Sequence, residues 1–341
     1  MNAERLGEAA NDLLHQAGFS GSLHATTLHG GANNRVYRVD TDRGPVVVKA
    51  YFRHPADPWD RLHAEWSFAR FAWDAGIRAL AEPLAVDFEA GVAAYAYIDG
   101  RPLCPSDVDA DAIAQALTFF NDLNRHRAAA GALQPAAEAC FSLGEHLRTI
   151  DGRVCALQRI EAAEPEDASA AAFVRDSLAP AWTSIRRTIE VEHPAGLEDP
   201  LDPAFRCVSP SDFGFHNALR LTDGKLTFVD FEYAGWDDPA KMVCDFFNQV
   251  AVPVPLDAFE AFVAGAATAV DDRGGALAKR ASLLMPAYTV KWCCILLNEF
   301  RAVASERRRY AQPRLDANKS EQLRKARTLF GRLQLARTQT L

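Results

Sequence analysis

The alternation of hydrophobic and polar positions divides the chain into a strand-rich beginning and a mostly helical remainder. Through much of the first hundred residues apolar and polar residues alternate with a period of two, which is typical of half-buried strands. The pattern predicts five strands, over residues 23–28, 35–40, 45–51, 84–88 and 92–97. One helix interrupts them, and its bounds are predicted by Asp57 as N-cap, Pro58 as first residue and Gly76 just past the end.

Beyond residue 102 the apolar positions recur with the period of an α-helix. Helices are predicted over residues 110–127, 142–160, 168–189, 256–270, 276–303 and 318–335, and one β element over residues 208–231 interrupts them. We therefore expect an α+β fold with two lobes. A small β-rich lobe would cover residues 1–98, and a large, mostly helical lobe residues 99–341.

Composition narrows the class of protein. The 341 residues carry a net charge of −8, which does not favour nucleic acid as a partner, and the Arg- and Lys-rich stretch 301–325 is interpreted as a solvated helix face. No window reaches the apolar length expected of a membrane span. Seven cysteines without C-x-x-C spacing predict free thiols. We expect a cytoplasmic protein with neither a membrane nor a nucleic-acid partner.

The polar residues around one predicted hairpin carry the strongest chemical signal. Asp223 and Gly224 lie between two alternating runs and predict a two-residue turn. That register places Asn217 opposite Asp230, with Cβ atoms about 5 Å apart. Their oxygens suit Mg²⁺, and Asp212, five residues before Asn217, can reach the same place. Phosphoryl transfer uses such a set: one carboxylate for the acceptor hydroxyl and two oxygen ligands for the metal.

The spacing from Asp212 to Asn217, followed by a strand and by Asp230 with Phe231, resembles the aminoglycoside phosphotransferase and choline kinase family. Members of that family have the protein-kinase fold, and the resemblance covers nearly the whole chain. It implies an ATP-dependent enzyme that phosphorylates a hydroxyl group of a small molecule, such as a sugar, an amino alcohol or an aminoglycoside. Asp212 would be the catalytic base, and Asn217 and Asp230 would bind Mg²⁺. The family usually has His two residues before the base, where this chain has Pro210, so other groups must support Asp212.

The same resemblance implies a nucleotide site in the strand-rich region. Gly30, Gly31 and Asn34 lie between the first two strands, where the family has its phosphate-binding loop. Lys49 lies on the third strand, and Glu65 lies beside the apolar stripe of the following helix. A carboxylate in that position needs a cation, so we predict the lysine–glutamate pair that positions ATP in kinases.

The break between the lobes is expected to contact the nucleobase through backbone groups. These groups would belong to Ala96, Tyr97 and Ile98.

The acceptor side is less specific. Glu232, Trp236 and Asp238 follow the proposed metal ligand, and acidic and aromatic groups suit a cationic acceptor. Lys291 lies in an apolar helix and has two interpretations. It could bind an anionic group of the acceptor, or it could extend its ammonium group to the surface, which is the more common behaviour of such a lysine.

Two other functions are compatible with these residues. One is a protein kinase, and the other is a nucleotide-binding scaffold with little catalysis, which the proline at position 210 would favour. The combination of Lys49, Glu65, Asp212, Asn217 and Asp230 argues against the scaffold. The choice between ATP and GTP is left open by the motifs.

Overall fold

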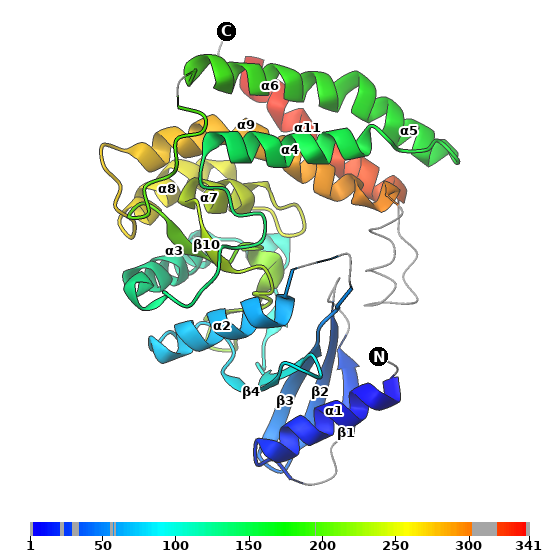
Figure 1. Cartoon of the computed structure of the whole chain (residues 1–341), viewed down its shortest axis with the longest axis vertical. Helices are drawn as coiled ribbons and strands as arrows, with labels where there is room; N and C mark the ends of the chain where they lie inside the picture. Colours follow the sequence, from blue (N-terminus) through cyan, green and yellow to red (C-terminus); the bar gives the residue numbers. More distant parts are fainter. Residues whose placement is uncertain are drawn as a thin grey trace.

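The computed structural model describes residues 3–20, 24–28, 34–54, 57, 59–194, 196–301 and 319–338. A β-rich region occupies the lower part of Figure 1, and a larger helical region lies above it. Helix α2 (Arg61–Asp74) lies between the two. The α+β class is confirmed.

The β-rich region is an antiparallel sheet of five strands in the order β1-β2-β3-β5-β4. The strands are His24–Leu28, Arg35–Thr41, Gly44–Ala50, Pro83–Asp87 and Val92–Ala96 for β1 to β5. They match the five predicted strands, and no end is shifted by more than one residue. In β3 the alternating residues Val46 and Val48 are buried with Leu13 and Leu14 of α1 (Ala3–Gln16), which leaves the opposite face of the strand, with Lys49, toward α2.

Helix α2 begins three residues later than predicted. Its N-cap is Asp60, whose carboxylate accepts a hydrogen bond from the backbone N–H of His63 at 3.0 Å. Asp57 instead binds the guanidinium of Arg61 at 2.8 Å, and Pro58 lies outside the described residues. Either aspartate is a good N-cap by residue type, so the choice depends on the three-dimensional contacts. Gly76 has a φ of 83° and ends the helix as predicted.

The helical region contains most of the predicted helices. They are α3 (Ala110–Arg125), α4 (Leu143–Leu157), α5 (Pro165–Phe173), α6 (Ala179–Glu192), α8 (Phe259–Ala267), α9 (Ala276–Leu296) and α11 (Lys319–Thr338). A π-helical segment, Val174–Leu178, joins α5 to α6, so the predicted helix 168–189 is one longer, irregular unit. Short strands make two small sheets: β10 (Gly235–Asp237) with β7 (Cys207–Ser209), and β6 (Arg101–Pro102) with β8 (Ala218–Arg220) and β9 (Leu226–Phe228).

Helix α7 (Pro239–Asn248) was not predicted. Every one of its residues is buried, including Lys241 and Asp245. Its polar residues Lys241, Asp245 and Asn248 recur at i, i+4 and i+7 and so follow the helical period, but the helix has only 10 residues, fewer than the window of about 11–18 over which that period is read. The sequence pattern therefore did not reveal it.

The last part of the chain corrects the expectation about membrane spans. Residues Ala276–Phe300, which comprise α9 and the short helix η6 (Leu297–Phe300), are long and apolar enough to cross a membrane, with a mean hydropathy of 1.2 in an 18-residue window. In the structure 61% of that window is buried. The helix packs against α7, α11 and α4, so its apolar surface is used in the core of the helical region.

A buried polar cluster ties α4, α7 and α9 together. The carboxylate of Asp238, the N-cap of α7, lies 3.0 Å from Nε2 of His146 on α4 and accepts a hydrogen bond from Arg280 on α9. The other ring nitrogen of His146 lies 2.6 Å from the hydroxyl of Tyr288. Burial lowers the pKa of His146, but interactions with Asp238 and Cys140 outweigh it and raise the pKa to about 9.

This cluster predicts a loss of stability at alkaline pH. Because the pKa of His146 is about 9 in the folded state and 6.5 as its ordinary value, its stabilisation is complete below pH 6.5 and is lost as the pH rises through 9. The shift corresponds to about 3 kcal/mol. We expect the free energy of unfolding, measured with urea, to fall between pH 6 and pH 9.5 by about that much more in the parent than in His146→Gln. An equal fall in both proteins would contradict the prediction.

Candidate active site

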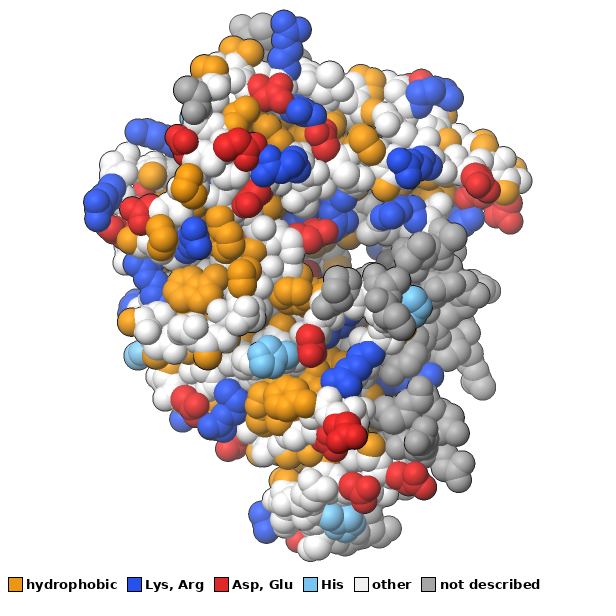
Figure 2. Space-filling model, viewed as in Figure 1, with side chains coloured by type: hydrophobic (Ala, Val, Ile, Leu, Met, Phe, Trp, Pro, Cys, Tyr) orange, Lys and Arg blue, Asp and Glu red, His pale blue; other side chains and the backbone are white. Residues whose placement is uncertain are grey.

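A cleft of about 370 Å³ separates the five-stranded sheet from the short β8–β9 hairpin. The surface of the molecule is hollowed between its two regions on the face shown in Figure 2. The sheet side contributes mostly apolar residues, and the hairpin side contributes the polar residues predicted to carry the chemistry. The lining residues include Leu28, Val36, Val47, Lys49, Glu65, Tyr95, His216, Asn217, Leu219 and Asp230.

Lys49 joins the two sides of this cleft. Its ammonium group donates to the two oxygens of Glu65 at 2.9 and 2.7 Å, and to Oδ1 of Asp230 at 2.7 Å. Burial raises the pKa of Glu65, although the charge on Lys49 opposes that effect. Burial lowers the pKa of Lys49, but Asp230 and Glu65 more than compensate and raise it. The predicted contact between Lys49 and Glu65 is confirmed, and the lysine is held charged at the floor of the cleft.

Because both partners are buried, breaking this pair should be costly. Lys49→Met is expected to lower the free energy of unfolding by about 3–5 kcal/mol, since it leaves Glu65 buried without its cation. Glu65→Gln should cost less, because Asp230 remains a partner for Lys49. The double variant should cost less than the sum of the two. Urea unfolding of the four proteins measures these differences.

An exposed ion pair on the same helix provides the control. Arg70 and Asp74 lie 2.9 Å apart with side chains that are 45% and 62% exposed. Alanine at both positions should change stability by no more than about 1 kcal/mol. Strict additivity of the Lys49 and Glu65 variants would show that the two residues are not coupled.

The hairpin that carries the polar residues has a different register from the predicted one. Leu219 pairs with Thr227, and the backbone carbonyl of Asn217 accepts from the N–H of Val229 at 2.9 Å, so Asn217 does not lie opposite Asp230. The loop has three residues rather than two, and its last residue, Gly224, has a φ of 86°. Three-residue loops with a left-handed last residue are the next common hairpin type.

Asp230 reaches the cleft by another route. Its φ of 69° is in the left-handed region, where the chain leaves the strand direction and turns its carboxylate toward Lys49. Phe231 holds this turn in place, because its ring packs on Phe68 of α2 with centroids 4.7 Å apart. Asp230 thus lines the same cleft as Asn217, although the predicted strand pairing was wrong by one residue.

The segment around Asp212 is anchored by alternate aromatic residues. Phe213 and Phe215 are buried, and both pack on Phe246 of α7. Asp212 and His216 do not belong to this core: their side chains are 39% and 22% exposed and contact each other, and His216 lies in the short 3-10 helix η4 (Phe215–Asn217). The missed helix α7 is therefore the support of the segment that carries Asp212.

The carboxylate of Asp212 is held by two neighbours. Its Oδ1 lies 3.3 Å from Nε2 of His216, and its Oδ2 lies 3.4 Å from Nδ2 of Asn217. Partial burial raises the pKa of Asp212, but these two contacts and the charge on Lys291 hold it below its usual range. Asp212 is therefore ionised at neutral pH and can accept a hydrogen bond.

The donor set fits a hard cation. Nδ2 of Asn217 donates to the backbone carbonyl of Asp212 at 3.0 Å, which orients the amide so that its Oδ1 is the atom left without a hydrogen bond from the described residues. Asp230 uses only Oδ1 for Lys49. Each residue thus keeps one oxygen for a metal, and oxygen ligands are those that Mg²⁺ prefers.

Some of the other residues predicted to bind the nucleotide line the cleft. Gly30 and Gly31 lie outside the described residues. Ala96, Tyr97 and Ile98 line the cleft, but the N–H of Ala96 already donates to the carbonyl of Glu82 at 2.9 Å, so it is not a donor for a nucleobase.

Asn34 also lines the cleft, but its amide is engaged. It accepts from the N–H of Phe52 and donates to the carboxylate of Glu232. This contact corrects the expectation for Glu232. That residue is 2% exposed and joins the sheet region to the segment after Asp230, so it does not face an acceptor.

The two further acceptor candidates, Asp238 and Trp236, both make contacts within the protein. Asp238 is completely buried in the cluster with His146 and Arg280, where its carboxylate is fully used as an N-cap and ion-pair partner. The indole N–H of Trp236 donates to the carbonyl of Ala130 at 3.1 Å, within the sheet of β7 and β10. Neither residue lines the cleft.

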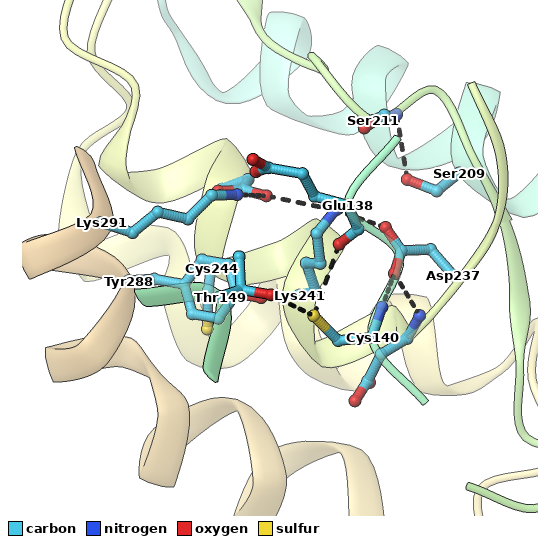
Figure 3. A network of polar contacts seen from close by, with 12 residues as sticks. Glu138, Cys140, Thr149, Ser209, Ser211, Asp237, Lys241, Cys244, Tyr288 and Lys291 are labelled. Atoms are coloured by element: carbon cyan, nitrogen blue, oxygen red, sulfur yellow. Dashed lines mark hydrogen bonds and ion pairs between the residues drawn. The ribbon is translucent and has the colours of Figure 1, made fainter. Parts of the chain in front are cut away.

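Lys291 does not extend to the surface. It is 5% exposed, and its ammonium group binds both oxygens of Asp245 on α7, at 3.0 and 2.9 Å. Figure 3 shows Lys291 pointing toward the segment with Glu138 and toward Lys241. Arg153 binds Glu138 at 2.5 and 2.6 Å, and the cations of Arg153, Lys291 and Lys241 outweigh the effect of burial and lower the pKa of Glu138.

Sequence reasoning missed Glu138 and Ser211, two residues near the site whose backbone conformation is unusual. Among the described non-glycine residues only Glu138, Ser211 and Asp230 have a positive φ, of 54°, 66° and 69°. Such conformations cost free energy and concentrate at functional sites. Ser211 precedes Asp212, and Glu138 lies in the network of Figure 3, beside Lys291. No pattern in the sequence distinguished these two from ordinary loop residues.

Comparison with known proteins gives consistent results. The model of the phosphotransferase enzyme family matches residues 24–281. A choline/ethanolamine kinase family protein from Mesorhizobium loti has a similar structure, with a TM-score of 0.56, 20% identity, and coverage of 95% of this chain and 99% of that one. The choline kinase LicA from Streptococcus pneumoniae has a TM-score of 0.58, 14% identity, and coverage of 96% and 99%.

A third similar structure is spectinomycin phosphotransferase in complex with ADP and spectinomycin, with a TM-score of 0.58 and 11% identity. The alignment covers 94% of this chain and 98% of that chain. A search of curated protein sequences returned no match. At these identities the structural likeness concerns the fold.

Proposed function

This chain belongs to the phosphotransferase enzyme family and is a small-molecule kinase, and we propose that Asp212, Asn217 and Asp230 carry its transfer of a phosphoryl group from ATP to a hydroxyl group. One observation supports this assignment above the others. Lys49 binds Glu65 and Asp230 at the same time, in a cleft that Asn217 also lines. A buried, charged lysine between those two carboxylates is suited to hold the phosphates of a nucleotide.

The nucleotide would occupy the cleft with its base against the apolar sheet side. Val36 and Val47 provide apolar contacts there, and Leu219 of β8 lines the cleft from the hairpin side. Tyr97 and Ile98 also line the cleft. Mg²⁺ would be held by Asn217 and Asp230, and it would neutralise charge on the phosphates.

Asp212 would act on the acceptor. As an ionised carboxylate it accepts the hydrogen bond of the acceptor hydroxyl and orients it toward the terminal phosphorus. The hydroxyl oxygen forms the new bond to phosphorus, the bond to the bridging oxygen of ADP breaks, and Asp212 takes the proton.

The acceptor would be a small molecule, and the paired charges around Asp212 do not require it to be a cation. The charged groups near Asp212 are balanced, since Lys291 pairs with Asp245 and Glu138 pairs with Arg153. Choline, ethanolamine and spectinomycin are the compounds in the names of similar structures, and sugars are the next class. The seven free cysteines support the cytoplasm as the compartment.

A panel of acceptors tests this function. ADP release from Mg·ATP would be measured with choline, ethanolamine, spectinomycin and a set of sugars, for the parent and for Asp212→Asn. Acceptor-dependent ADP release by the parent, with the phosphorylated product found by mass spectrometry, supports the proposal. The scaffold alternative predicts nucleotide binding without release of ADP for any acceptor, and the protein-kinase alternative predicts transfer to peptides only.

A further inference from the structure

His216 occupies a position from which it can orient Asp212. The ring nitrogen Nε2 lies 3.3 Å from Oδ1 of Asp212, four residues earlier in the chain. The residue two positions before Asp212 is Pro210, which has no side-chain donor. Among the described residues only His216 and Asn217 form hydrogen bonds with Asp212, and the amide of Asn217 makes its shorter bond to the backbone carbonyl. The hydrogen bond to Oδ1 is thus supplied by His216.

The surroundings of the ring determine which nitrogen carries the proton. Nδ1 of His216 is buried and has no hydrogen-bond partner in the described part of the chain. A buried N–H without an acceptor costs more than a buried lone pair, which is more often left unpaired in proteins. The neutral ring therefore carries its proton on Nε2, and that N–H points at Asp212. In this form Nε2–H of His216 donates a hydrogen bond to the carboxylate of Asp212, and the lone pair of the ring lies on Nδ1, away from Asp212.

Gly214 provides the space for the ring. A Cβ atom at position 214 would lie 2.7 Å from Nδ1 and 2.9 Å from Cε1 of His216. The φ of Gly214 is 173°, an extended conformation that any residue adopts, so the glycine is needed for space and not for its backbone. A larger residue would push the imidazole away from Asp212.

We propose that His216 is the positioning residue of Asp212 and that Gly214 keeps its place free. The inference rests on the proposed function. By holding Oδ1, the ring leaves Oδ2, which has only a long contact of 3.4 Å to Asn217, to receive the acceptor hydroxyl. The effect on phosphoryl transfer is exerted through Asp212, because the ring makes its hydrogen bond to that carboxylate.

Kinetics with the best acceptor of the panel test this role. His216→Ala is expected to lower kcat roughly 10- to 100-fold, a range typical of residues that orient a functional side chain, with the KM for ATP within about twofold of the parent. His216→Gln keeps a donor at the place of Nε2 and should recover most of the loss. In the Asp212→Asn background His216→Ala should cause no further loss, because residues that act as a unit are not additive.

Gly214→Ala should reproduce the loss caused by His216→Ala. The matched control is Gly131→Ala, where a Cβ would meet nothing within 4 Å, and this variant should have the parent kcat. Parent-like turnover of His216→Ala, an additive loss in the Asp212→Asn background, or equal turnover of the two glycine variants would each overturn the inference.

A second measurement does not depend on an acceptor. Long-range ¹H–¹⁵N spectra of the full chain, recorded at a pH where the ring is neutral and assigned with His216→Gln, report which nitrogen carries the proton. A proton on Nε2 supports the inference, and a proton on Nδ1 overturns it. If no acceptor in the panel is phosphorylated by the parent, the proposed function fails, whereas the proton position still decides the geometry.

Discussion

Asp212→Asn is expected to lower the turnover of phosphoryl transfer by about 100- to 10,000-fold, the range over which a general base contributes to catalysis. The amide keeps the shape of the side chain but cannot take the proton of the acceptor hydroxyl. Nucleotide affinity should stay close to that of the parent, because the nucleotide is expected to bind at Lys49 and Asp230, which contact each other and not Asp212. Steady-state rates with saturating Mg·ATP, together with a fluorescence titration of nucleotide, separate these two effects.

Another aspartate on the same hairpin provides the control for this variant. Asp223 lies in the three-residue loop, its side chain is 49% exposed, and its carboxylate pairs with Lys225. Asp223→Asn should retain full turnover and a nearly unchanged melting temperature. If Asp212→Asn turns over as fast as the parent, Asp212 is not the base.

Asp230→Asn is expected to remove the effect of Mg²⁺ on nucleotide binding. Asn tolerates the left-handed φ of 69° that this position requires, whereas Ala would add backbone strain. The variant loses one anionic oxygen ligand, and Lys49 keeps Glu65 as a partner, so the fold should be retained. Metal ions supply several kcal/mol to such reactions, so turnover should fall by about 100-fold or more.

Thermal unfolding with nucleotide measures the metal dependence directly. At a free concentration of Mg·ATP about 100 times its Kd, binding stabilises the folded parent by about 2.7 kcal/mol. That stabilisation should shrink for the parent when Mg²⁺ is replaced by a chelator, and Asp230→Asn should show the smaller value under both conditions. A variant that responds to Mg²⁺ as strongly as the parent would show that Asp230 does not bind the metal.

Local patterns in the sequence predicted one side-chain contact of the site in addition to most of the strands and helices. The period of two in β3 and the apolar stripe of α2 led to the prediction that Lys49 and Glu65 meet, and the structure confirms the contact. The argument succeeded because both residues lie within regular elements, where the side-chain direction follows from the period. The spacing from Asp212 to Asn217, followed by a strand and by Asp230 with Phe231, led to the resemblance to the phosphotransferase family, and the family match confirms that resemblance.

Tertiary structure decided the features that depend on partners distant in sequence. The pairing of Lys291 with Asp245 required α7, a helix too short for the sequence pattern to reveal, and the two residues lie 46 positions apart in the chain. Asp238 looked like an acceptor residue, yet His146 and Arg280, 92 and 42 residues away in the chain, engage its carboxylate.

The register of the β8–β9 hairpin and the packing that supports Asp212 also depend on residues that are distant in sequence. The choice between a two- and a three-residue loop depends on how the flanking strands pack. Asp230 lines the same cleft as Asn217 because of its left-handed backbone and not through strand pairing with it. The position of a charged residue in the sequence pattern does not identify its ion-pair partner. The role of such a residue is determined by the charges that surround it in space, and a sequence reveals those only where neighbours in space are also neighbours in the chain.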